Sequence, residues 1–137
     1  MGIGLMSKII AKVVGIQSVE SLNLVSFECR DAILTMVSLE LENEISIGRE
    51  VLLDAKPTSI AVGKNIQGEL SYSNQLNVKI ASLSAGELVC SLKLQFHDFV
   101  LESVITTATQ KRINLQANDE VIALINSTDL FIEKVLS

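Results

Sequence analysis

The stretch KIASLSAGELVCSLKLQFHDFVLESV, residues 79–104, decides the fold, because apolar and polar residues alternate along much of it. A period of two is typical of a β-strand with one buried face, whereas a helix repeats its apolar residues every three to four positions. The alternation breaks at AGEL (85–88) and at HD (97–98), which are typical of turns. We therefore predict short strands joined by hairpin turns.

The same pattern occurs earlier, in KVVGIQSVESLNLVSFECRDAILTMV, residues 12–37. At an offset of 67, identical residues fall opposite each other, and past Val37 an offset of 70 continues the match. The identical pairs are Lys12 and Lys79, Glu20 and Glu87, Asp31 and Asp98, Leu34 and Leu101, Val37 and Val104, Glu50 and Glu120, Val51 and Val121, Thr58 and Thr128, and Lys64 and Lys134. We interpret this as a tandem duplication with units at 6–66 and 67–137.

Each unit is predicted to continue in the same way after its hairpins. A polar interval, ENEISIGRE (42–50) or TATQKRINLQANDE (107–120), could hold one short helical turn. Final apolar runs follow at 51–62 and 121–135, interrupted at KPTS (56–59) and NSTD (126–129). Short strands with turns at regular spacing predict an all-β protein with a small barrel or sandwich in each unit.

Composition excludes several classes of function. The 137 residues carry a net charge of −5 with four Phe, one Tyr and no Trp, which disfavours nucleic-acid binding. No uncharged apolar run is long enough to span a bilayer, and the N-terminus lacks the pattern of a signal peptide. The two cysteines have no metal-type spacing. We expect a cytoplasmic protein that binds neither nucleic acid nor membrane and holds no metal.

Three polar features invite a functional interpretation. The cluster SYSNQ (71–75) is either a solvated linker or a group of ligand donors. The pair His97–Asp98 corresponds to Arg30–Asp31 in the first unit, so a solvated hairpin turn is favoured over catalysis. Glu40, Glu42 and Glu44 could bind a hard cation, but an exposed strand edge is favoured. No nucleophile has a suitable histidine partner, so we do not expect an enzyme.

The order of short motifs resembles the Mop/TOBE family, the small OB-like barrels of molybdate-binding proteins. In the second unit the matching elements are SYSNQL, SAGELV, VIT, LQANDEV and NSTDLFI, and in the first unit they are ISIGREV and KPTSIAV. The resemblance implies two tandem OB-like β-barrels that bind molybdate or tungstate in the cytoplasm, with no other cofactor. It also implies a homo-oligomer, with the anion held where units meet.

The resemblance carries the family's site residues onto named positions. Ser71 and Asn74 match the opening motif, in which Ser73 replaces the usual arginine. Thr106 matches the threonine after Ile105, with Ser38 at the corresponding place in the first unit. The family's last motif, before the final apolar strand, corresponds to KPTS in the first unit and NSTD in the second. It gives Lys56 and Thr58 in the first unit, and Asn126 and Ser127 in the second, as site residues. The first unit's opening would be residues 4–7, which keep nothing of the motif.

Two alternatives follow from the positions at which this sequence differs from the family's motifs. A composite site could combine Ser71 and Asn74 of the second unit with Lys56 and Thr58 of the first, because each copy lacks what the other keeps. The other alternative is a degenerate TOBE-type module that no longer binds an anion and serves interaction or oligomerisation.

Overall fold

The computed structural model describes residues 8–137, which form two five-stranded antiparallel sheets. The first sheet consists of β1 (Ile9–Val19), β2 (Leu22–Cys29), β3 (Ala32–Ser38), β4 (Glu50–Asp54) and β10 (Phe131–Val135). The second consists of β5 (Ala61–Gly63), β6 (Asn74–Ala85), β7 (Val89–Phe96), β8 (Phe99–Thr106) and β9 (Glu120–Ile125). A 3-10 turn, η1 (Pro57–Ser59), and one short helix, α1 (Thr107–Arg112), complete the chain. The predicted all-β class is confirmed, and each sheet curls as an OB-like barrel does.

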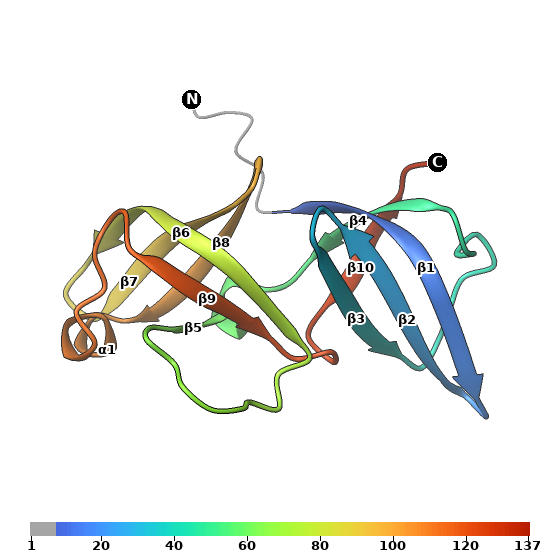
Figure 1. The fold of residues 1–137 in the computed structure, drawn as a ribbon, viewed down its shortest axis with the longest axis horizontal. Helices are drawn as coiled ribbons and strands as arrows, with labels where there is room; N and C mark the ends of the chain where they lie inside the picture. The colour runs from blue at the N-terminus through green and yellow to red at the C-terminus, as the bar shows by residue number, and fades with distance from the viewer. Residues whose placement is uncertain (1–7) are drawn as a thin grey trace.

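The two sheets exchange one strand each (Figure 1). Their orders, β10-β4-β1-β2-β3 and β5-β9-β6-β7-β8, are the same pattern, with the outermost strand taken from the other half of the chain. β10 pairs with β4, and β5 pairs with β9. The division at residues 66 and 67 therefore stays a prediction about the sequence repeat, because each barrel contains strands from both sides of it.

Equivalent irregularities recur in both barrels. β1 has a register shift between Val13 and Gly15 against β2, and β6 has one between Ile80 and Ser82 against β7. Such bulges increase local twist, which lets a long strand bend around a barrel. After the bulge both strands continue into an exposed hairpin end.

The loops that enter β4 and β9 also correspond. Gly48 has φ of 96° and its N–H donates to the Val13 carbonyl at 2.8 Å. Asn118, its counterpart at an offset of 70, has φ of 76° and donates to the Ile80 carbonyl at 2.7 Å. Glycine and asparagine are the residues that adopt this left-handed conformation most readily. The aligned residues thus make the same backbone bonds in both halves.

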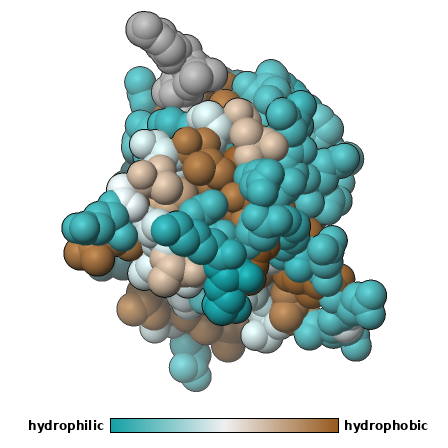
Figure 2. Space-filling model, turned by 90° about the vertical axis from the view of Figure 1, so that its left-hand side faces the viewer, coloured by the Kyte–Doolittle hydropathy of each residue, from teal (hydrophilic) through white to brown (hydrophobic). Residues whose placement is uncertain are grey.

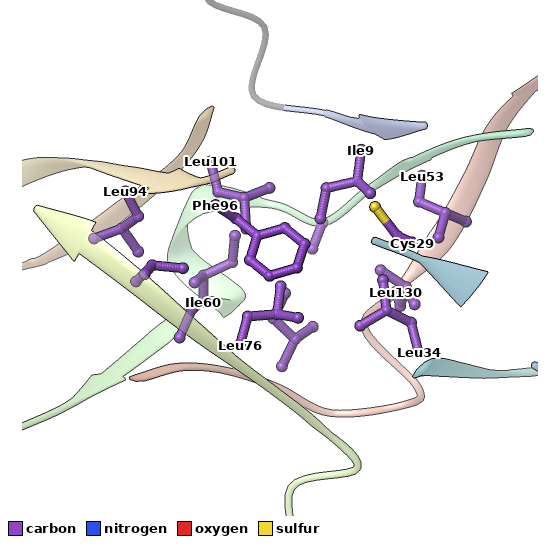
Figure 3. Close-up of a cluster of buried hydrophobic side chains, with 14 of the residues drawn as sticks. Ile9, Cys29, Leu34, Leu53, Ile60, Leu76, Leu94, Phe96, Leu101 and Leu130 are labelled. Atoms are coloured by element: carbon purple, nitrogen blue, oxygen red, sulfur yellow. The ribbon is translucent and has the colours of Figure 1, made fainter. Parts of the chain in front are cut away.

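A single apolar cluster runs through both barrels (Figure 3). Ile9, Leu53 and Leu130 lie near the first sheet, and Leu76 and Phe96 lie on the side of the second sheet, all of them almost completely buried. Hydrophobic burial stabilises a fold roughly in proportion to the apolar area removed from water. Because the cluster is shared, the barrels stabilise each other.

Some of the exposed apolar residues lie at hairpin ends, and others, such as Leu39 and Ile47, lie in the loop between β3 and β4. Leu88, between β6 and β7, is 77% exposed, Val89 at the start of β7 is 55% exposed, and Val19 at the end of β1 is 64% exposed. On the face of the second barrel, Figure 2 shows apolar groups separated by hydrophilic ones. Among residues 8–137, no helix has the length and apolarity needed to cross a membrane.

Candidate functional site

The outer edge of β3 is covered by residues of the second half of the chain. The Asn74 side chain, fully buried, accepts a bond from the Thr35 N–H at 2.7 Å and donates to the Thr35 carbonyl at 3.0 Å. The Ser127 carbonyl accepts a bond from the Val37 N–H at 3.0 Å. Asn74 thus acts like a neighbouring strand, and its amide is already occupied on both its oxygen and its nitrogen.

Two equivalent turns lie where the halves of the chain meet. In the first, the Ser59 N–H donates to the Lys56 carbonyl at 2.8 Å, and in the second the Asp129 N–H donates to the Asn126 carbonyl at 3.0 Å. Each turn follows the last strand that stays in its own barrel and precedes the strand that is exchanged. The strand exchange therefore brings the two turns together at the contact between the barrels.

A cavity of about 360 Å³ lies between these turns, and we call it the Thr58 cavity. It is lined by Thr58, Ser59, Ile60, Ala61, Tyr72, Val104, Ile105, Asn126 and Asp129. Hydroxyl groups, a phenol and an amide thus converge from η1, the residues before β6 and the turn after β9. The one carboxylate of the lining, Asp129, adds negative charge, and the lining contains no cation.

Ser73 lies in a different cavity, of about 320 Å³, which we call the Ser73 cavity. Its lining residues are Asp31, Ala32, Ile33, Ser73, Gln75, Leu76, Asn77, Phe96 and His97. Tyr72 and Ser73, although adjacent in the chain, therefore line different cavities. The polar cluster SYSNQ (71–75) is therefore divided between the Thr58 cavity and the Ser73 cavity.

The remaining predicted residues have local roles or are exposed. The Ser38 hydroxyl bonds to the Glu40 carbonyl. The Thr106 hydroxyl caps α1 by accepting a bond from the Thr109 N–H at 3.1 Å. Ser71 and Lys56 are exposed and line neither cavity, although Lys56 directly precedes η1. Within residues 8–137, no group of three His, Cys, Asp or Glu side chains could hold a metal ion.

A family model, the TOBE domain, matches residues 70–132. This part of the chain is similar to a TOBE domain. The predicted family resemblance is confirmed here, and the tandem arrangement with a first TOBE-like unit stays a prediction. No curated protein sequence matches the chain significantly.

The solved structures include a similar fold. A crystal structure of the cytoplasmic molybdate-binding protein ModG, with molybdate bound, superposes with a TM-score of 0.85 at 17% sequence identity. The match covers 96% of this chain and 98% of that one. Likeness at this identity shows the fold, and it extends well beyond the TOBE domain to nearly all of the chain.

The Thr58 cavity joins the TOBE domain to the segment before it. Tyr72, Asn126 and Asp129 lie inside the matched residues, whereas Thr58 and Ser59 precede them. Sequence reasoning selected Thr58 and Asn126 but missed Ser59, Tyr72 and Asp129 as lining residues. The alignment of KPTS with NSTD, which pairs Ser59 with Asp129, was the signal that could have indicated them.

Proposed function

We propose that this protein binds a tetrahedral oxyanion, molybdate or tungstate, in the Thr58 cavity. The observation that carries the proposal is the convergence of the two equivalent turns on one cavity, with Thr58 from the first half and Asn126 from the second. The fold shared with molybdate-bound ModG supports the same ligand class.

The donors around the cavity suit a small anion. The hydroxyls of Thr58, Ser59 and Tyr72 and the amide of Asn126 can donate hydrogen bonds without carrying charge. Lys56, adjacent to η1, supplies a cation on a long flexible side chain that can reach over the exposed turn. An anion held in this way needs no net positive charge on the protein.

The wider role belongs to the same proposal. ModG is described as cytoplasmic, and we infer for this chain a cytoplasmic role in molybdate or tungstate storage, buffering or sensing, without catalysis. Association into a homo-oligomer is also part of the proposal. The exposed apolar residues at the hairpin ends, Val19, Leu88 and Val89, support it.

A second candidate function is favoured by Asn74. Its amide is committed to Thr35, so it holds the barrels together instead of presenting donors to an anion. Asp129 also places a carboxylate in the cavity. Both features fit a TOBE-type interaction module that has kept the paired barrels and lost its ligand.

Calorimetric titration with molybdate, tungstate, sulfate and phosphate separates the two functions. We expect one molybdate or tungstate per chain, with sulfate and phosphate bound far more weakly. Thr58→Val removes one hydroxyl at nearly constant volume and should weaken binding roughly fivefold to tenfold. Thr128→Val is the matched control, since Thr128 occupies the equivalent turn position but does not line the cavity. No heat with any anion, for folded protein freed of ligand, would leave the interaction module as the function.

Asp129→Asn gives a prediction of the opposite sign. Removing a like charge from the cavity should tighten molybdate binding, by about fivefold if the repulsion is near 1 kcal/mol at a solvated site. The same titration measures it. Unchanged or weaker binding would place the anion away from the Thr58 cavity.

A further inference from the structure

Two hairpin turns face each other across the contact between the barrels. The β2–β3 turn carries Arg30 and Asp31, and the β7–β8 turn carries His97 and Asp98. Arg30 Nη2 lies 2.8 Å from each carboxylate oxygen of Asp98, and His97 Nε2 lies 2.9 Å from Asp31 Oδ1. Arg30 corresponds to His97 and Asp31 to Asp98, so the two pairs are one contact made twice in opposite directions, as in a two-fold symmetric interface.

The two halves of this crossed contact differ in one chemical respect. The Arg30 guanidinium stays charged at every physiological pH and binds Asp98 with a forked geometry. An imidazole changes its charge between about pH 5 and 8. One pair is therefore permanent, and the other depends on protonation of the single histidine of the sequence.

We propose that His97 is a pH-sensitive clamp, whose protonation turns its hydrogen bond with Asp31 into an ion pair and tightens the contact between the two barrels. The neutral imidazole keeps the hydrogen bond but loses the charge. The contact is then tighter in acidic than in alkaline solution, within the range where imidazole titrates.

The charges around His97 support this direction. The hydrogen bond from His97 holds the pKa of Asp31 below its usual range, and Arg30 does the same for the pKa of Asp98. Both carboxylates are therefore ionised when the imidazole gains its proton. Arg30 is the one cation in the facing turn, and its charge disfavours a positive charge on His97. Arg30 is paired with Asp98, which offsets this repulsion.

The other groups near the clamp are uncharged. Burial raises the pKa of the neighbouring Cys29 thiol to about 11, so it stays neutral. The residues of the β6 side that share the Ser73 cavity with His97 are Ser73, Gln75, Leu76 and Asn77. The side chains of His97 and Asp31 are 42% and 75% exposed, so water and salt screen the pair and its effect is modest.

Two backbone amides report whether the contact is closed. The Thr35 N–H bonds to the Asn74 side chain and the Val37 N–H bonds to the Ser127 carbonyl, both across the contact between the barrels. Their hydrogen exchange rises whenever the barrels separate. Comparing variants at the same pH cancels the intrinsic pH dependence of exchange.

The experiment compares wild type with His97→Gln, whose amide can replace the neutral hydrogen bond without ever becoming charged. At about pH 5.5, toward the acidic end of the range in which imidazole side chains change their charge, the two amides should exchange roughly two- to fivefold more slowly in wild type. At about pH 8 the ratio should approach one. His97→Arg, which copies the permanent pair, should protect the amides at both pH values.

Asp31→Asn tests whether the partner is the one named. When Asp31→Asn is already present, adding His97→Gln should no longer change the exchange rates at acidic pH. A ratio that stays constant between the two pH values, or one that survives Asp31→Asn, overturns the proposal. Any cost of seating glutamine at the positive φ of 54° is the same at both pH values and leaves the comparison intact.

Discussion

Asn74 shows how a single side chain can replace a strand. Its carbonyl oxygen and its amino group bond to the N–H and the carbonyl of Thr35, as a neighbouring backbone would. An asparagine is suited to this because its side chain carries one acceptor and one donor group in the same plane. Its placement at the start of β6 fixes the second barrel against the edge of the first.

Asn74→Ala should therefore destabilise the protein by roughly 2–4 kcal/mol, because it leaves both Thr35 groups without partners. Urea unfolding measures the loss, and Asn77→Ala, an exposed position on the same strand, is the control. Asn74→Asp should be as harmful at neutral pH, since a carboxylate cannot donate to the Thr35 carbonyl, and should recover as the carboxyl is protonated. A loss no larger than that of Asn77→Ala would contradict this role.

Cys29 gives a prediction at alkaline pH. Burial raises the pKa of its thiol to about 11, above the ordinary value near 8.5. Unfolding then lets the thiol ionise, so its contribution to stability is intact below about pH 8.5 and is lost as the pH rises toward 11, with a slope of up to about 1.4 kcal/mol per pH unit. Cys29→Ala should lack this slope. Parallel curves for the two proteins would show that the thiol does not titrate in this way.

At the scale of elements, each exchanged strand completes the sheet of the other half of the chain. β10 pairs with β4 over Phe131 to Val135, and the Leu136 N–H also donates to the Glu50 carbonyl at 2.7 Å. Without β10, the edge of β4 and the apolar residues beneath it would meet water. The C-terminal segment is thus a structural part of the N-terminal barrel.

A chain truncated after Leu130 lacks β10. Its amides should lose protection from hydrogen exchange first in β4, which is far from β10 in sequence, and only at longer exchange times in β7. Hydrogen exchange resolved by segment measures this order. The β7 amides serve as the internal control, because that strand pairs with β6 and β8 and not with β10. Simultaneous loss in β4 and β7 would contradict this order and would show that the barrels respond as one from the outset.

At the scale of the whole molecule, the shared core predicts a single unfolding transition. One apolar cluster spans both barrels, and each barrel needs a strand of the other half. Fragments 1–66 and 67–137 should therefore be largely unfolded alone and should recover β-structure when mixed. Circular dichroism of the separate and mixed fragments tests this, with the intact chain as reference. A fragment that folds alone would show independent barrels.

The sequence predicted the individual strands and turns better than it predicted which strands pair with each other. Alternation located the hairpin strands, and the polar interval 107–120 does contain a short helix, α1. The interval 42–50 contains no helix. The runs interrupted at KPTS and NSTD each proved to be two strands, but no local pattern indicates that the second joins the other barrel. Pairing partners depend on the shared core, which periodicity cannot describe.

The candidate site was predicted only in part for the same reason. Thr58 and Asn126 line one cavity, although the predicted composite site combined Thr58 and Lys56 with Ser71 and Asn74 and did not include Asn126. Ser71 and Asn74 were expected to join them, but Asn74 bonds to Thr35 instead. Tyr72 and Ser73 precede β6 and line different cavities, and no local pattern in the sequence predicts this separation. The anion-binding roles of these residues remain a prediction.

The exchange of β10 also has a consequence for folding during synthesis of the protein. A ribosome delivers the chain from its N-terminus, and domains ordinarily close as soon as their residues have left the exit tunnel. Here the N-terminal barrel must wait for residues 131–135, which are synthesised long after the strands that they complete. Until β10 has left the tunnel, the edge of β4 has no partner, and such edges are prone to pair with other chains. The nascent protein is therefore most open to misassembly in the interval between the synthesis of β4 and that of β10.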